Sequence, residues 1–224
     1  MKISKLSIYS NKIKAQLKFY RDDLGFEILN YDEKSFEIKC GYSVLRFEYR
    51  ENPTPYHIAF HIPDNQEKYA LQWIENKTNA LKNNNDKIID FSNWQAKSVY
   101  FYDEDENIME FISRNDFSKP KSALFSADSI VGIAEIGLAT EDIPSNFEKM
   151  KQECKLEKFD GNFEHFCAVG EPSGLIITIN KNKKDWFPTS DKAYSSAFEL
   201  EFSHQSKNYL LKFSSNDRLN ISQL

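Results

Sequence analysis

The chain has 224 residues, of which 40% are hydrophobic, and its formal net charge is −5. This length and apolar content are sufficient for a buried core in one large domain or two small ones. The acidic balance, without a basic block, argues against nucleic acid as a partner. No apolar run approaches the ~18 residues of a membrane span, and the first residues lead into a strand pattern rather than a signal segment. We therefore expect a cytoplasmic protein without a membrane partner.

Cysteine usage points to the same reducing environment. The three cysteines, Cys40, Cys154 and Cys167, are odd in number, lie far apart and form no Cys-x-x-Cys pair. This spacing argues against a disulfide framework and against a thiolate metal site. We predict three reduced thiols in the core.

The first fifty residues have the pattern of a strand, a helix and three further strands. Residues 3–9 alternate apolar and polar side chains, which is typical of a half-buried strand. Asn11 is a suitable helix cap, and helical spacing continues through residues 13–24 until Gly25. Three strands follow, over residues 26–30, 35–40 and 42–49. Together these elements form one βαβββ module.

A second βαβββ module follows the linker 51–55. Its first strand, residues 56–62, ends at Pro63, and its helix is predicted to begin after Asp64 and to reach Leu81. A polar loop comes next, and the sheet resumes near residue 88. The last two strands, 97–102 and 108–112, enclose an acidic turn at 103–107, where Asp and Asn cap their own amides.

The pattern then begins a third time. After a polar linker at 115–128, a strand is predicted over residues 130–139 and a helix from about 140 to 154. Short strands over 163–169 and 174–180 complete a shorter third module, and 197–202 with 209–211 form a truncated fourth. We predict a division into residues 1–115 and residues 128–224.

Two motifs in the second module resemble a known family. Residues 57–60 read His-Ile-Ala-Phe, and residues 100–111 combine an aromatic strand, an acidic turn and Asn-Ile-Met-Glu-Phe. They are similar to the first strand and the last two strands of the vicinal oxygen chelate superfamily. That superfamily includes glyoxalase I, bleomycin and fosfomycin resistance proteins and extradiol ring-cleaving dioxygenases. The helix end at residues 19–26 also resembles the family.

The resemblance implies an α+β fold of repeated βαβββ modules. Modules are paired to form a cupped, mixed β-sheet with helices outside. Pairing of the first two modules would make residues 1–115 a ligand cup. Because family members pair modules within or between chains, the resemblance is also compatible with a homodimer.

The resemblance also implies a site. In the family, the histidine and glutamate of these motifs bind a divalent metal, and they correspond here to His57 and Glu110. We expect these two residues to carry any catalysis or metal binding. In the first module, Lys5 and Arg46 stand where metal-binding relatives have further ligands.

Two cations at these positions argue against a tightly held metal. An ammonium or guanidinium group offers no lone pair. At ~4–5 Å and an effective dielectric near 20, each would repel a dication by several kcal/mol. We therefore expect no metal or a weakly held divalent metal. A shifted register would bring Ser7 or Glu48 towards the cup, and the expected ligand-binding residues are Lys5, Ser7, Arg46, Glu48 and Trp94.

Three other features receive structural interpretations. His61 shares a strand face with His57, but four residues at ~3.3 Å each place it ~13 Å away, so we interpret it as lining or structural. Glu135 occupies the first-strand position of the third module, but the last strand there offers only Ile176, Ile177 and Thr178, so we expect no second metal site. Residues 186–189 are interpreted as a structural clasp.

Three functions remain open from the sequence. The first is a glyoxalase- or bleomycin resistance-like protein that binds a small aromatic or anionic molecule in the N-terminal cup, without a tight metal. The second is a metal-dependent lyase or extradiol dioxygenase that uses His57 and Glu110. The third is a non-catalytic structural or sequestering module.

Overall fold

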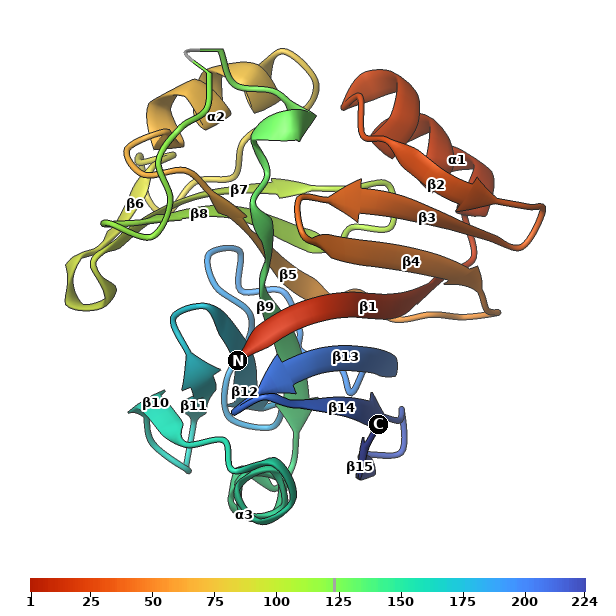
Figure 1. Ribbon diagram of the computed structural model, residues 1–224, viewed down its shortest axis with the longest axis vertical. Coiled ribbons are helices and arrows are strands. Elements are labelled where there is room, and N and C mark those ends of the chain that lie inside the picture. The colour runs from red at the N-terminus through yellow and green to blue at the C-terminus, as the bar shows by residue number, and fades with distance from the viewer. Residues whose placement is uncertain (123) are drawn as a thin grey trace.

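The computed structural model describes residues 1–122 and 124–224 (Figure 1). It has two mixed β-sheets of seven and eight strands. Helices α1 (Ile13–Lys18) and α2 (Glu67–Glu75) lie at one end of the molecule and α3 (Ile143–Cys154) lies at the other. None of the helices in the described part of the chain is long and apolar enough to cross a membrane. The predicted α+β fold of repeated βαβββ modules is confirmed.

The first module follows the predicted order. Its elements are β1 (Lys2–Ser10), α1 (Ile13–Lys18), β2 (Ile28–Tyr31), β3 (Ser35–Cys40) and β4 (Ser43–Tyr49). Helix α1 continues into a π-helical turn that contains Tyr20. The Tyr20 side chain is fully buried, and its hydroxyl donates a hydrogen bond to Asp103 Oδ2 at 3.1 Å. This contact fastens the first module to the acidic turn of the second.

The second module differs from prediction in the length of its helix. Its elements are β5 (His57–Ile62), α2 (Glu67–Glu75), β6 (Ile89–Phe91), β7 (Ala96–Tyr102) and β8 (Ile108–Arg114). Helix α2 ends at Glu75 and does not reach Leu81. The residues that follow, Asn76 to Asn79, are mostly weak helix formers. The Leu81 N–H instead donates to the Tyr100 carbonyl at 2.7 Å, which returns the chain to the sheet.

The third module is complete and is followed by three strands without a helix. Asp142 caps helix α3 by accepting a hydrogen bond from the Ser145 N–H at 3.0 Å. The module contains β9 (Gly132–Thr140), α3 (Ile143–Cys154), β10 (Lys158–Gly161), β11 (Phe166–Glu171) and β12 (Gly174–Asn180). The final strands are β13 (Phe198–His204), β14 (Lys207–Phe213) and β15 (Leu219–Gln223).

The sheets pair the modules differently from the sequence prediction. The eight-stranded sheet has the order β10-β11-β12-β9-β5-β8-β7-β6, so the second module pairs with the third. The seven-stranded sheet, β15-β14-β13-β1-β4-β3-β2, joins the first module to the final strands. The prediction that residues 1–115 pair their two modules into one cup is therefore wrong.

The burial of the first strands gives a physical reason. Every residue of β5 and of β9 is buried, so both strands suit the centre of a sheet that is covered on both faces. In contrast, β1 and β13 alternate buried and partly exposed residues. Pairing β1 with β13 leaves one face of that sheet open to solvent.

One apolar core lies between the two sheets. Leu6 and Phe47 of the seven-stranded sheet belong to the same buried cluster as Phe60 and Ile136 of the eight-stranded sheet. The three cysteines are free and buried, as predicted. Because one face of each sheet belongs to this core, any ligand site on a sheet must use the opposite face.

Two glycines provide a matched test of how the sheets are held together. Gly41, at φ +60°, lies against Val131, the residue before β9. The Val131 carbonyl oxygen would be 2.1 Å from a Cβ added at Gly41. Gly25, at φ +76°, has no atom within 4 Å of such a Cβ. We expect Gly25→Ala to cost about 1 kcal/mol of unfolding free energy from backbone strain, and Gly41→Ala about 3 kcal/mol because overlap is added. Urea unfolding followed by circular dichroism measures both, and equal losses would contradict the close approach.

Candidate metal centre

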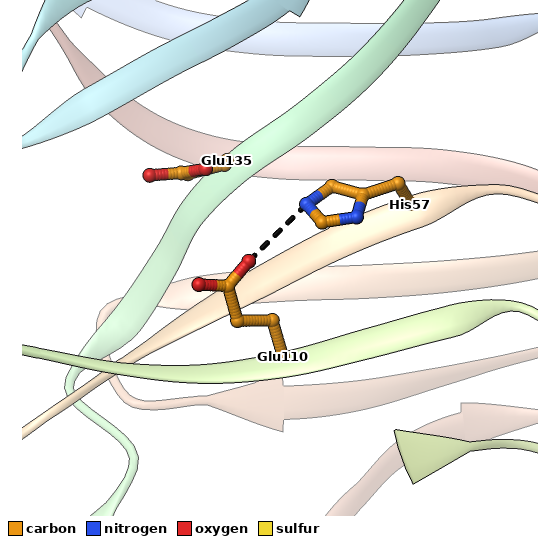
Figure 2. Close-up of side chains that lie close together, drawn as sticks. All are labelled: His57, Glu110 and Glu135. Atoms are coloured by element: carbon orange, nitrogen blue, oxygen red, sulfur yellow. Dashed lines mark ion pairs between the residues drawn. The ribbon is translucent and has the colours of Figure 1, made fainter. Parts of the chain in front are cut away.

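Three buried side chains converge on the face of the eight-stranded sheet that does not belong to the core. His57 begins β5, and Ala59, two residues later, is the register partner of Glu110 on β8 and of Glu135 on β9. One ligand-type atom from each of His57, Glu110 and Glu135 lies within 4.8 Å of the other two. Figure 2 shows the three side chains reaching the same point from three strands. Because the side chain of Ala59 is a single methyl group, it leaves room between the two carboxylates.

Each carboxylate is held by a neighbour. His57 Nε2 lies 3.2 Å from Glu110 Oε2, and the Ser98 hydroxyl donates to Glu110 Oε1. Arg114 Nη2 donates to Glu135 Oε1 at 2.6 Å, and both of these side chains are almost fully buried. These contacts fix the orientation of both acids in the way that outer partners fix metal ligands.

The electrostatics of the cluster suit a cation. Burial and, next, the charge of Glu110 raise the pKa of Glu135 to about 7, although Arg114 opposes the shift. The pKa of the adjacent Tyr100 hydroxyl is also raised, by burial and by Glu110. The negative charges of Glu110 and Glu135 therefore repel each other in a buried environment, and a divalent ion between them would relieve this repulsion. An imidazole and two carboxylates are a chemically suitable donor set.

The cluster lies against a cavity of about 600 Å³ whose lining includes six aromatic side chains. The Trp94 indole lines it and donates a hydrogen bond to Asp160 Oδ2 at 2.5 Å. The His57 ring stacks on Trp186, with 5.2 Å between ring centroids. The remaining aromatic lining residues are Phe91, Tyr100, Phe166 and Phe187. Such a cavity suits a flat apolar ligand that has few polar groups.

The third module does not repeat the Glu110 position. On β8, Glu110 lies two residues beyond Ile108, the register partner of His57. On β12, the residue two beyond Leu175, the register partner of Glu135, is Ile177. Ile177 lines the cavity. The described residues therefore supply three donors, and the fourth place is apolar.

Four of the ligand residues expected from the sequence lie elsewhere. Lys5 and Arg46 both contact Glu37 Oε1, at 2.7 and 3.2 Å, on the open face of the seven-stranded sheet. Ser7 and Glu48 are adjacent to them in the register of β1 and β4. The prediction that Lys5 and Arg46 face His57 and Glu110 is wrong, because the modules that carry them belong to different sheets. The electrostatic objection to a metal that rested on these cations does not apply.

Comparison with known proteins supports the architecture. No protein-family model and no curated protein matches the sequence. A candidate dioxygenase from Bacillus subtilis matches all of this chain and 84% of its own, with a TM-score of 0.61 and 12% identity. A variant of glyoxalase I from Zea mays matches 99% of this chain and 92% of its own, with a TM-score of 0.57 and 10% identity. The protein has the vicinal oxygen chelate fold. The fold expected from residues 57–60 and 100–111 is thereby confirmed.

Three residues in or beside the cluster were not expected there from the sequence. Glu135 was recognised as a first-strand residue but was assigned to a module without a partner site. Arg114, which holds Glu135, gave no signal in the sequence. Trp186, interpreted as part of a clasp, covers His57 instead. His57 and Glu135 occupy equivalent positions in the first strands of two modules. This equivalence was the one signal in the sequence that could have placed both residues in the same site.

Gly137 allows Trp186 to cover His57. A Cβ at Gly137 would lie 2.5 Å from Trp186 Cη2 and 3.1 Å from His57 Cβ. We expect Gly137→Ala to displace the indole and to change its fluorescence, with a loss of about 1–3 kcal/mol of stability from overpacking. In a protein that carries Trp186→Phe, adding Gly137→Ala should leave the fluorescence unchanged, because the indole that moves is absent. An unchanged spectrum in the single variant would show that the close approach does not exist.

His61 predicts a specific pH dependence of stability. Its ring stacks on Phe117 at 4.1 Å between centroids, and neither ring nitrogen has a partner among the described residues. Burial, assisted by the charge of Arg114, lowers the pKa of His61 to about 3. Below pH 6.5, His61 therefore becomes protonated in the unfolded chain but stays neutral in the folded protein. The free energy of unfolding falls as the pH falls towards 3.

We expect His61→Phe to remove this contribution. The difference in unfolding free energy between wild type and variant should change by up to ~1.4 kcal/mol per pH unit between pH 6 and pH 4. Urea titrations at several pH values measure it. A constant difference across this range would mean that His61 titrates normally in the folded protein.

Proposed function

We propose that the protein is a metal-dependent enzyme that binds a divalent cation through His57, Glu110 and Glu135. The observation that carries this proposal is the convergence of three buried donor groups, within 4.8 Å, at one wall of an aromatic cavity. Three protein ligands with a remaining open position are typical of catalytic rather than structural centres. A small molecule in the cavity would complete the coordination.

The donor set narrows the metal and its chemistry. One imidazole and two carboxylates suit Mn²⁺, Zn²⁺ or Fe²⁺ better than a soft ion. Such a cation would polarise an oxygen atom of the substrate as a Lewis acid. Arg114 and Ser98 would hold the two carboxylates in place, and Trp186 would exclude water from one side of His57.

The cavity indicates the class of substrate. The aromatic side chains of its lining favour a small aromatic molecule, and the buried donors beside them favour one that carries an oxygen atom for the metal. We propose chemistry of the lyase or isomerase type, because the centre offers one imidazole and two carboxylates. The two-histidine, one-carboxylate set of non-haem iron oxygenases is not matched.

A second candidate is a metal-free binding protein for the same small molecules. It is favoured by the contact between Arg114 and Glu135, in which a guanidinium already neutralises one of the two acids. The first function inferred from the sequence, binding of a small molecule without a tight metal, would then apply to the aromatic cavity instead of the N-terminal cup. The acids and His57 would form an internally paired polar floor for an aromatic ligand.

Metal binding separates the two candidates. Metal-depleted protein is titrated with Mn²⁺ and followed by electron paramagnetic resonance, and we expect about one tightly bound ion per chain. Glu110→Gln and Glu135→Gln should each weaken binding at least tenfold, since each removes a ligand charge. Glu37→Gln, on the open face of the other sheet, is the matched control and should bind as wild type does. Binding that is equally weak in all four proteins would favour the metal-free candidate.

A further inference from the structure

A second cleft, of about 470 Å³, is lined by both ends of the segment 181–197, whereas residues 184–187 in the middle of the segment line the aromatic cavity. This segment connects β12 to β13 and so joins the two sheets. It supplies Trp186 and Phe187 to the aromatic cavity, and Lys181, Lys192 and Tyr194 to the second cleft. The two cavities have no lining residue in common.

The second cleft brings three cations together in an acidic protein. Arg50, Lys181 and Lys192 line it, and Glu51 is the single acid among its described lining residues. The chain as a whole has a net charge of −5. Lys181 is paired with Glu141 and Asp217, so Arg50 and Lys192 are the cations of the lining that an incoming anion could pair with.

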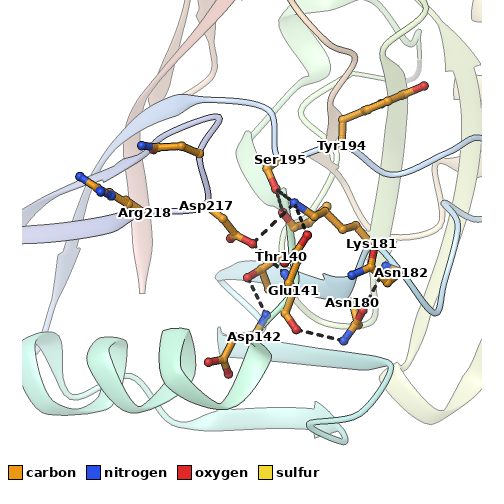
Figure 3. Close-up of polar contacts among 12 residues, drawn as sticks. Thr140, Glu141, Asp142, Asn180, Lys181, Asn182, Tyr194, Ser195, Asp217 and Arg218 are labelled. Atoms are coloured by element: carbon orange, nitrogen blue, oxygen red, sulfur yellow. Dashed lines mark hydrogen bonds and ion pairs between the residues drawn. The ribbon is translucent and has the colours of Figure 1, made fainter.

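Lys181 is held in position by a polar network that Figure 3 shows. Its Nζ donates to Ser195 Oγ at 3.1 Å and lies 3.3 Å from Glu141 and 3.7 Å from Asp217. Ser195 is buried and donates in turn to the Ala139 carbonyl at 2.8 Å. The ammonium group is therefore fixed beside the cleft, and its three N–H donors already have acceptors in the protein.

The other two cations have no acidic partner among the described residues. The Arg50 guanidinium lies over the Tyr9 ring, 3.2 Å from its centroid. Stacking of this kind holds the group while its N–H edge stays available for a bidentate contact. Lys192 lies 5.7 Å from the centroid of the Tyr194 ring. Both side chains can therefore turn their donors towards a ligand.

We propose that this cleft binds the phosphate group of a small organic molecule. Arg50 would bind two phosphate oxygens with its planar fork, and Lys192 would act as a point charge. Thr54, Asn182 and Ser215 line the cleft and add neutral donors. The exposed Tyr194 ring and a volume in the range of small-molecule sites leave space for the organic part.

The test uses inorganic pyrophosphate as the probe on the metal-depleted chain of 224 residues. We expect pyrophosphate to raise the thermal midpoint and to bind with a measurable heat in calorimetry. Arg50→Gln with Lys192→Gln should weaken binding at least tenfold, because two charge-assisted contacts are lost. Lys14→Gln removes one exposed charge of helix α1 that has no acidic partner in the described part of the chain, and this control should bind as wild type does.

Two further arms identify the site and the chemistry. His57→Ala should bind pyrophosphate as wild type does, whatever becomes of metal binding, because His57 does not line this cleft. Citrate should bind at least tenfold more weakly than pyrophosphate if the site is specific for phosphate. The proposal is overturned if pyrophosphate does not bind, if the double variant binds like the control, if His57→Ala abolishes binding, or if citrate binds equally well.

Discussion

The antiparallel contact between β5 and β9 is the constraint on which the rest of the structure depends. It joins the second and third modules into one sheet, and its register places Glu135 opposite Ala59. The parallel contact of β5 with β8 places Glu110 opposite the same alanine from the other side. Two carboxylates and His57 therefore meet on one face without any loop having to fold over to bring them together. Side chains that are fixed by strand register are positioned more rigidly than side chains on loops, which a centre with defined geometry requires.

This arrangement costs free energy, which indicates that it serves a function. Two carboxylates and an imidazole are withdrawn from water, and a buried charge is unfavourable unless it is paired. Arg114 and Ser98 offset part of the cost, and the raised pKa of Glu135 shows that the offset is incomplete. Replacing such groups by apolar residues would often stabilise a protein. A buried pair of acids beside a cavity is therefore more typical of a functional site than of a purely structural contact.

The two sheets use similar strands for different purposes. On the eight-stranded sheet, the face away from the core closes around an aromatic cavity. On the seven-stranded sheet, the corresponding face carries Lys5, Arg46 and Glu37 in partly exposed ion pairs, which contribute little stability. The segment 181–197 bridges the sheets and lines both the aromatic cavity and the cationic cleft. One connection thus contributes side chains to two separate cavities.

The sequence by itself determined the modules, most of the strands, and the placement of His57 and Glu110 on one sheet face, because alternation along a strand and the residues of a tight turn are local properties. It did not determine which modules pair, and so it placed Lys5 and Arg46 in the site and left Glu135 out. Every module begins with a similar apolar strand, and each such strand has an edge that can pair with any of the others. The choice was made by tertiary structure: β5 and β9 are buried on both faces and stabilise each other at the centre of a sheet, whereas β1 retains a polar face that must meet water.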